Sequence, residues 1–179
     1  MYSFEQHYGI YESAPIGLDQ INNLKDDKLF VTVGGGIGAG KTFLTKKFVE
    51  LPIIDVDDHI TEVGGGKYDR ANLGQGRKAF EGALDKALEG DESFIHMGTN
   101  ANLNTTKKRL QKAKENGFTT VLVLIDTKPE KAAEQIKGRE DRDEIAMERI
   151  VQSHDDALNV FETLKKDNNI VDFFVYNKR

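Results

Sequence analysis

The sequence contains no cysteine, no tryptophan and only three prolines among its 179 residues. The absence of cysteine excludes a disulfide scaffold, a thiolate metal site and a thiol nucleophile, and it is typical of a reducing compartment. No apolar run approaches the roughly 18 residues of a membrane span, and residues 1–11 lack the basic and then apolar pattern of a signal peptide. We therefore expect a soluble, cytoplasmic protein with no membrane attachment.

Charge and length set further limits. Lys and Arg number 25 against 30 Asp and Glu, which gives a formal net charge of −5. This balance argues against a broad nonspecific nucleic-acid binder, which would be basic overall, but it leaves a local basic groove open. A length of 179 residues is typical of one domain with its own core.

Five short apolar runs, rich in residues that favour β-structure, predict strands. The first four are continuous rather than alternating, which is typical of strands buried on both faces of a parallel sheet. Helical patterns separate them, so the sequence predicts an α/β fold: an open, mainly parallel sheet of about five strands with helices on both faces. The runs are Leu29–Val33, Ile53–Val56, Phe94–Met97, Val121–Ile125 and Val171–Tyr176.

Local signals place several helix ends and the start of the domain. Gly90 suits a C-terminal cap, Thr105 or Thr106 could cap the next helix, and Pro129 suits a first helical turn. Residues 1–27 fall outside the alternation, and we expect an arm or helix there that packs on the sheet edge of a domain formed by residues 28–179. The aromatic residues of that arm could alternatively help to hold a nucleotide base.

A glycine-rich stretch follows the first predicted strand. Residues 35–42 read Gly-Gly-Ile-Gly-Ala-Gly-Lys-Thr, a complete G-x-x-x-x-G-K-[ST], and a helical pattern follows. Such glycines let the backbone wrap a phosphate chain at the positive end of a helix. We expect Lys41 to reach the β- and γ-phosphates of ATP and Thr42 to bind Mg²⁺. The predicted nucleotide-binding residues are Gly35, Gly36, Gly38, Ala39, Gly40, Lys41, Thr42 and Phe43.

The same stretch also fits a looser pattern. Gly34, Gly36 and Ala39 spell G-x-G-x-x-A, and Asp55 lies about 20 residues further on, as in dinucleotide-binding folds. A lysine and threonine after the last glycine have no use in such a fold, which favours the phosphate loop. A switch GTPase is disfavoured because the guanine motif N-K-x-D is incomplete. Motors and AAA-type ATPases normally need a longer chain and an acid at the end of the strand Phe94–Met97, so a small kinase fits best.

Carboxylates follow the second predicted strand. Asp55 and Asp57 lie at its carboxyl end, where open α/β sheets bind ligands, and strand alternation would turn both to the same face. Asp57 could accept the proton of an attacking hydroxyl as a catalytic base. The pair could instead hold Mg²⁺ or form a solvated strand end.

Two segments carry a family resemblance. Residues 54–58, Ile-Asp-Val-Asp-Asp, resemble the hydroxyl-activating segment of the polynucleotide 5′-hydroxyl kinase and zeta-toxin kinase group. Residues 98–109 are similar to the Gly-Thr loop of zeta-type kinases and to the D-T-N-L-N-P-x-R-R segment of polynucleotide kinases. Met97 stands where zeta toxins carry an acid, so the substrate does not carry over.

The resemblance implies a phosphate-loop (P-loop) kinase with particular site residues. Asp57 would be the base, and Thr99 and Asn100 would contact the acceptor. We expect Asp55 and Asn102 to contact the acceptor as well. The resemblance also implies catalytic arginines in a lid after the fourth strand. Arg139 and Arg142 are the candidates, because guanidinium groups neutralise charge on phosphate oxygens.

The acceptor is the least determined part of the function. The cations of the segment 107–114 could attract a nucleic-acid backbone or a phosphorylated substrate, or could form a solvated helix face. We expect an ATP- and Mg²⁺-dependent kinase whose acceptor is a nucleic acid or nucleotide-like hydroxyl, such as a 5′ end or a hydroxymethylated base of phage DNA. A zeta-toxin-like sugar-nucleotide kinase and an ATP-binding regulatory module are the alternatives. The sequence does not decide whether a protein partner exists. His96 and His154 are expected to be packed histidines rather than metal ligands.

Overall fold

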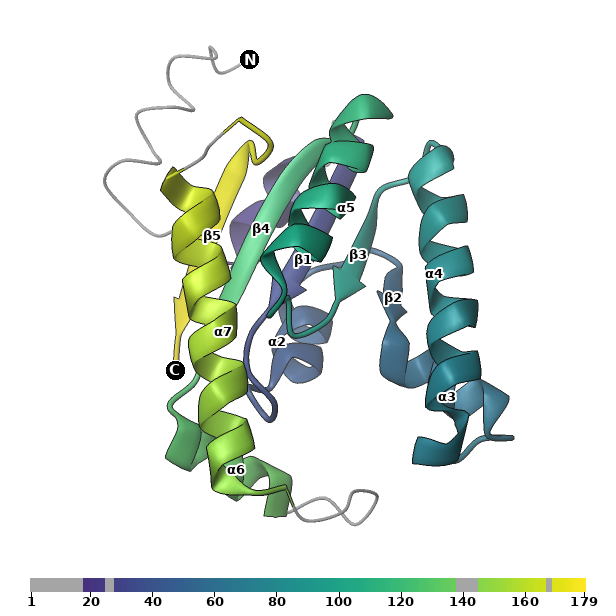
Figure 1. Cartoon of the computed structure of the whole chain (residues 1–179). Helices are drawn as coiled ribbons and strands as arrows, with labels where there is room; N and C mark the ends of the chain where they lie inside the picture. The colour runs from purple at the N-terminus through teal and green to yellow at the C-terminus, as the bar shows by residue number, and fades with distance from the viewer. Residues whose placement is uncertain (1–17, 25–27, 138–144, 167–168) are drawn as a thin grey trace.

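Five parallel strands form one sheet in the order β2-β3-β1-β4-β5 (Figure 1). The computed structural model describes residues 18–24, 28–137, 145–166 and 169–179. All five predicted strands are present, with ends shifted by no more than two residues, and the predicted α/β fold is confirmed. The strands are β1 (Leu29–Gly34), β2 (Ile53–Asp55), β3 (Phe94–Met97), β4 (Thr119–Asp126) and β5 (Phe173–Lys178).

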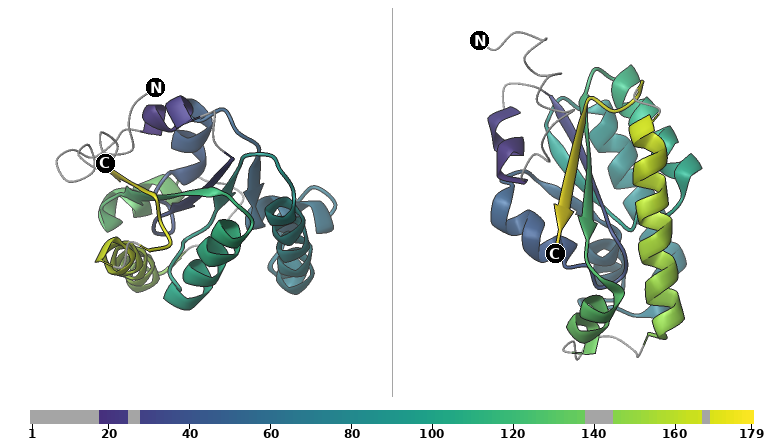
Figure 2. Two further views of the ribbon diagram at one scale, coloured as in Figure 1. Left: turned by 90° about the horizontal axis from the view of Figure 1, so that it is seen from above. Right: turned by 90° about the vertical axis from the view of Figure 1, so that its left-hand side faces the viewer.

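Helices cover both faces of this sheet. The 3-10 helix η1 and helix α2 lie on one face, and α4, α5 and α7 lie on the other (Figures 1 and 2). Helix α3 follows β2 and packs against α4, while α6 packs against α7. The helices are η1 (Leu18–Leu24), α2 (Lys41–Phe48), α3 (Val56–Val63), η2 (Arg70–Asn72), α4 (Leu73–Glu89), α5 (Leu103–Glu115), α6 (Pro129–Lys137) and α7 (Met147–Lys166).

The central strand β1 explains why the predicted strands are continuously apolar. Successive side chains of a strand point to opposite faces. Val31 and Val33 pack with η1 and α2, whereas Phe30 packs with α4, α5 and α7. Both faces are therefore buried, and no position of β1 is available for a solvated side chain.

The segment before β1 lies on a sheet face. Leu18 and Ile21 of η1 are 2% and 1% exposed and join the core layer of β1 and α2. The expected position at the sheet edge is therefore wrong for residues 18–24, because these apolar side chains complete the face that α2 leaves uncovered. Residues 1–17, which carry the aromatic residues suggested for base binding, lie outside the described residues.

The end of β2 also differs from the prediction. The strand stops at Asp55, whose carboxylate accepts a hydrogen bond of 3.0 Å from the backbone N–H of Asp57 and caps α3. Asp57 therefore lies in the first turn of a helix, and the prediction that strand alternation turns both carboxylates to one face was wrong. An aspartate is a strong N-cap because its oxygen satisfies an N–H that has no partner inside the helix.

Other helix ends test the capping predictions. Gly90 caps the end of α4 and Pro129 opens α6, as predicted. Helix α5 is capped three or four residues earlier than the sequence indicated, since Asn102 rather than a threonine accepts the Thr105 N–H at 2.9 Å. This shift places the loop 98–102 directly against the sheet end.

The close packing of α3 on α4 depends on Gly76. A Cβ built there would lie 2.5 Å from Cγ1 and 2.7 Å from Cα of Ile60, which is 1% exposed. We expect Gly76→Ala to lower the free energy of unfolding by about 1–3 kcal/mol, because the helices must separate. Gly82→Ala on the same helix meets nothing within 4 Å and should raise the free energy of unfolding by about 0.5–1 kcal/mol. Denaturant titration of both variants checks this; equal effects would contradict it.

Candidate active site

The predicted phosphate loop has a backbone that requires glycine. Gly35, Gly38 and Gly40 have φ angles of 149°, 76° and 80°, which other residues rarely adopt. A Cβ at Gly35 would lie 2.6 Å from the carbonyl oxygen of Ile125, and one at Gly38 would lie 2.6 Å from that of Ala132. The loop is thus pressed against β4 and α6, and its geometry fits the backbone cradle that a phosphate chain needs.

Lys41 begins α2 and folds back over this loop. Its Nζ donates hydrogen bonds to the carbonyl oxygens of Gly35 at 2.9 Å and Gly36 at 3.0 Å. The ammonium group therefore lies across the loop, where it can reach a bound phosphate. Thr42 follows in the first helical turn, half-buried, while Phe43 is 64% exposed.

Helix α7 and the end of β4 hold the loop from outside. Ser153 Oγ accepts a hydrogen bond of 2.9 Å from the Ile37 N–H, and Thr127 Oγ1 donates one of 2.9 Å to the Ala39 carbonyl. The backbone of His154 packs so closely on Gly36 that a Cβ there would lie 3.0 Å from its Cα. These contacts hold the loop against α7 and the end of β4.

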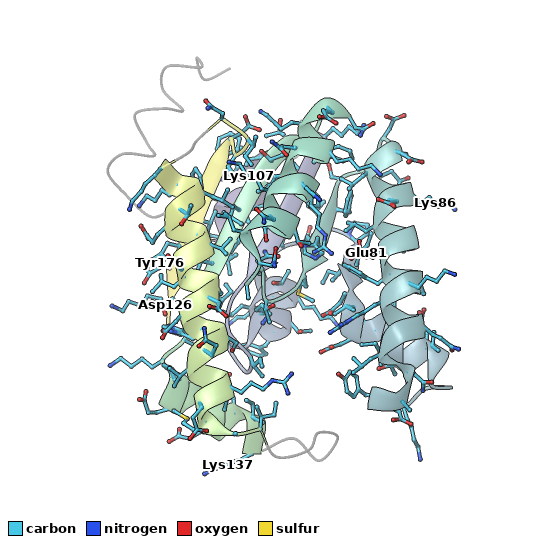
Figure 3. The ribbon with its side chains drawn as sticks, viewed as in Figure 1. Glu81, Lys86, Lys107, Asp126, Lys137 and Tyr176 are labelled. Carbon is cyan, nitrogen blue, oxygen red and sulfur yellow. The ribbon has the colours of Figure 1, made fainter. Side chains whose placement is uncertain are left out.

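Asp126, at the end of β4, joins α7 to β5 (Figure 3). It accepts hydrogen bonds from the Tyr176 hydroxyl and, at 2.8 Å, from His154 Nε2. Burial raises the pKa of Asp126, but these two bonds outweigh burial and lower it overall. Burial likewise lowers the pKa of His154, and its bonds to Asp155 and Asp126 outweigh burial and raise it. Burial and Asp126 raise the pKa of Tyr176 to about 12.

This network predicts a specific pH dependence. A raised His154 pKa stabilises the fold below the unfolded value of 6.5, and that contribution is lost as pH rises through the folded pKa. Asp126→Asn should therefore lower the His154 pKa, which an NMR titration of the imidazole measures. The stability gap between wild type and Asp126→Asn should be widest between about pH 4 and 6.5 and narrow at higher pH. Asp156→Asn, whose carboxylate accepts from Gln152, is the matched control; an equal shift there would contradict the assignment.

Arg179 lies next to the phosphate loop. Its backbone N–H donates 2.8 Å to the Asp126 carbonyl, and a Cβ on Gly40 would collide with its guanidinium group. A second cation thus flanks the loop, on the side away from β2.

Asp55 and Asp57 lie on the other side of the loop, at the junction of β2 and α3. Burial raises the pKa of Asp55, and the charges of Asp57 and Asp58 add to this. The hydrogen bond from the Asp57 N–H opposes the rise, and the positive charge of Lys41 opposes it to a smaller extent. Asp57 is half-buried.

A pocket of about 200 Å³ opens beside this junction. It is lined by Val56, by the segment Met97–Asn102, and by side chains of α4 and α5. The Gly35 N–H donates to the Thr99 carbonyl at 3.2 Å, so one wall of the pocket touches the phosphate loop. The predicted acceptor contacts Thr99, Asn100 and Asn102 all line it.

Two of these three side chains also have structural tasks. Asn100 is 9% exposed with φ 51°, and its Nδ2 donates to Thr32 Oγ1 at 2.8 Å. Asn102 caps α5, as described above. Thr99 and Asn102 are exposed, whereas Asn100 is buried.

His96 supports the pocket from within the core. It is 1% exposed, and its Nδ1 and Nε2 lie 2.8 Å from Thr32 Oγ1 and 3.2 Å from Arg109 Nη1. Burial, with the charge of Arg109, lowers the pKa of His96 to about 3, so the ring is neutral. Its contacts are those of a packed histidine, as predicted.

The basic segment on α5 faces acids rather than solvent alone. Arg109 pairs with Glu81 at 2.6 Å, Lys112 with Asp85 at 2.8 Å, and Lys114 with Asp172 at 2.5 Å. Glu81 lies on the side of α4 that faces α5 (Figure 3). The positive charge that suggested a nucleic-acid surface is therefore largely balanced.

The arginines predicted for the lid, Arg139 and Arg142, lie outside the described residues. Across residues 18–24, 28–137, 145–166 and 169–179, no cluster of three His, Asp or Glu side chains could hold a metal ion. In the same part of the chain, every helix is too short or too polar to span a membrane.

Comparison with known proteins identifies the family. Residues 29–164 match the family AAA_33, described as an AAA domain. The chain belongs to this family. Larger ATPases also carry the AAA name, but this AAA domain has the fold of P-loop kinases. A search among curated proteins finds no match.

Solved structures share the fold at low sequence identity. The PezAT toxin-antitoxin system of Streptococcus pneumoniae is 19% identical over 99% of this chain and 78% of that one, with a TM-score of 0.60. Shikimate kinase from Acinetobacter baumannii is 17% identical over 88% of both chains, with a TM-score of 0.53. The Pnkp1/Rnl/Hen1 RNA repair complex is 15% identical over 76% of this AAA domain protein but only 46% of that chain, with a TM-score of 0.62.

Several residues that build the site were not predicted. Ser153 and Thr127 hold the phosphate loop and Arg77 lines the pocket, while Arg109 was expected only as one cation of the segment 107–114 and not as part of a pocket. Ser153 lies 116 residues from its partner Ile37, so no local pattern indicates the contact. A signal existed for Arg109: Glu81, Asp85 and Glu89 recur every four residues on α4, which predicts an acidic stripe that a basic helix would pair with.

Proposed function

We propose that this AAA domain protein is an ATP- and Mg²⁺-dependent kinase that phosphorylates a hydroxyl of a nucleotide-like or nucleic-acid acceptor. The observation that carries the proposal is the pocket wall at Thr99, which joins the phosphate loop to a pocket that Val56, the residue between Asp55 and Asp57, also lines. We infer that donor and acceptor meet between Lys41 and Asp57, as an in-line phosphoryl transfer requires.

The reaction assigns a task to each group. The acceptor hydroxyl oxygen forms a bond to the γ-phosphorus, the bond from that phosphorus to the bridging oxygen breaks, and ADP leaves. Asp57 takes the proton of the hydroxyl. Lys41 stabilises charge on the β- and γ-phosphates, and the glycine loop supplies N–H donors.

Mg²⁺ would neutralise charge on the phosphate oxygens. The Thr42 hydroxyl and the carboxylates of Asp55 or Asp57 are oxygen donors of the kind that Mg²⁺ prefers. Arg139 and Arg142 are proposed to stabilise the transferring phosphoryl group from the segment between α6 and α7. Phe43 is proposed to contact the nucleotide with the loop residues 35–42.

The neighbouring structures support different parts of this proposal. The RNA repair complex favours a nucleic-acid acceptor, and the toxin-antitoxin system favours a protein partner. A sugar nucleotide is the alternative acceptor, because residues 98–109 are also similar to the Gly-Thr loop of zeta-type kinases. We propose a nucleic acid or nucleotide as the first acceptor to test, because residues 98–109 resemble the polynucleotide kinase segment. We also propose a cytoplasmic location, since the sequence contains no cysteine.

Label transfer from γ-labelled ATP tests the proposal. The acceptors are oligonucleotides with a 5′-hydroxyl, DNA with hydroxymethylated bases, sugar nucleotides and small hydroxy compounds, each in a separate reaction with Mg²⁺. Labelling of any acceptor supports a kinase, and its identity defines the substrate. ATP binding without labelling of any acceptor would instead support a regulatory module.

A further inference from the structure

The pocket lined by Val56 and the segment Met97–Asn102 has an uneven charge. Its charged lining residues are Arg77 and Arg109 against Glu81, and His96 at its inner wall is neutral. Arg77 is exposed on α4 and Arg109 comes from α5, so the two arginines face the pocket from different helices. Such a lining attracts an anion.

Arg109 is held in a fixed orientation. Its Nη2 donates to Glu81 at 2.6 Å, its Nη1 lies 3.2 Å from His96 Nε2, and its guanidinium carbon lies 5.3 Å from the centre of the Phe80 ring. Its side chain is only 19% exposed. These contacts use two of its five N–H donors among the residues that the structure describes, so donors remain for a ligand.

The positions of the ring protons explain how His96 holds Arg109 in place. Arg109 can only donate, so His96 Nε2 must accept, and the ring proton must lie on Nδ1. The Nδ1–H then donates to Thr32 Oγ1, which also accepts from Asn100 Nδ2. A neutral His96 thus orients the guanidinium without repelling it, and it ties Arg109 to the loop 98–100.

We propose that this pocket binds the anionic group, a carboxylate or a phosphomonoester, of a compact hydroxy-compound acceptor through Arg109 and Arg77. This inference rests on the proposed kinase activity, and among the acceptors it selects a compact anionic compound over a nucleic-acid polymer. Guanidinium forks match both anions in shape and charge. A volume of about 200 Å³ suits a small molecule, and the acids that face α5 disfavour a long polyanion.

A binding experiment separates this inference from the proposed function. The Nε–H resonance of Arg109 in ¹⁵N-labelled protein, assigned by its absence in Arg109→Met, is followed at saturating Mg²⁺-ADP so that the phosphate loop is occupied. Acetate and inorganic phosphate are titrated as the carboxylate and phosphate probes. We expect at least one to shift this resonance saturably and the neutral probe glycerol to leave it unchanged. Failure of ADP to shift the amides of residues 35–42 would refute the nucleotide site instead.

Acceptor pairs test the same idea by turnover. For the carboxylate, kcat/KM is compared between shikimate and its methyl ester. For the phosphate, it is compared between glucose 6-phosphate and glucose. In at least one pair, the charged member should have a kcat/KM about tenfold or more above the neutral one. Arg109→Met and the exposed Arg77→Met should each lower kcat/KM about tenfold or more, mainly through KM, whereas Lys78→Met on α4 should stay within about twofold.

The outcomes are decisive in both directions. If charged and neutral members react equally, or if neither anion shifts the Arg109 resonance, the inference is wrong. It is also wrong if a 5′-hydroxyl oligonucleotide is the acceptor and reacts equally with wild type and Arg77→Met. Arg77 is exposed on its helix, so Arg77→Met tests the pocket even if Arg109→Met fails to fold.

Discussion

Lys41→Met is expected to lower phosphoryl transfer from ATP by about 100- to 1,000-fold or more, the loss typical of removing one charge-stabilising donor. Methionine keeps the length of the side chain but has no cation for the β- and γ-phosphates. The wild-type Nζ already lies over the loop, bonded to the carbonyls of Gly35 and Gly36. Initial rates with γ-labelled ATP measure the effect.

The control for this variant is on the same helix. Lys46 is exposed in the last turn of α2, so Lys46→Met should leave the rate within about twofold of wild type. Thermal unfolding of both variants shows whether the fold is kept. Wild-type turnover in folded Lys41→Met would refute a phosphate-loop kinase.

Asp57→Asn should lower kcat by about 100- to 10,000-fold while the Kd for ATP stays near its wild-type value, because only proton acceptance is lost. Asparagine keeps the shape of the side chain and removes its charge. Single-turnover kinetics and nucleotide titration measure the two quantities separately.

Two neighbouring aspartates make this test specific. Asp58 is exposed in the same helical turn, and Asp58→Asn should leave kcat within about twofold. Asp55→Asn keeps an oxygen that can cap α3, so its effect on stability should be small. A large loss of kcat in Asp55→Asn, with normal turnover in Asp57→Asn, would move the base to Asp55.

The phosphate loop was predictable because its information is local. Strand, glycines, lysine and threonine follow one another over residues 29–42, and each required φ angle belongs to a glycine. The order of the five strands could not be read in this way, since it depends on pairing between residues far apart in the chain.

The junction at Asp55 shows where two local patterns compete. Residues 53–56 form a short, largely apolar run that suits a strand, but Val56, Ile60 and Val63 repeat at spacings of four and three, which suits a helix. The helix prevails because Ile60 is buried against Gly76 and Asp55 satisfies the first free N–H.

The pocket is the part that a single sequence could not reveal. Arg77, His96 and Arg109 come from three elements, and only the packing of α4 and α5 on β3 brings them together. The cations of α5 suggested a nucleic-acid surface because the sequence does not show that acids of α4 pair with Arg109 and Lys112.

The position of Arg179 has a practical consequence for recombinant work. Its backbone is bonded to the end of β4, and its guanidinium lies against Gly40. Whatever follows Arg179, natural sequence or a purification tag, begins at the rim of the phosphate loop and would compete there with nucleotide. Activity assays should therefore use protein whose tag has been removed or attached elsewhere.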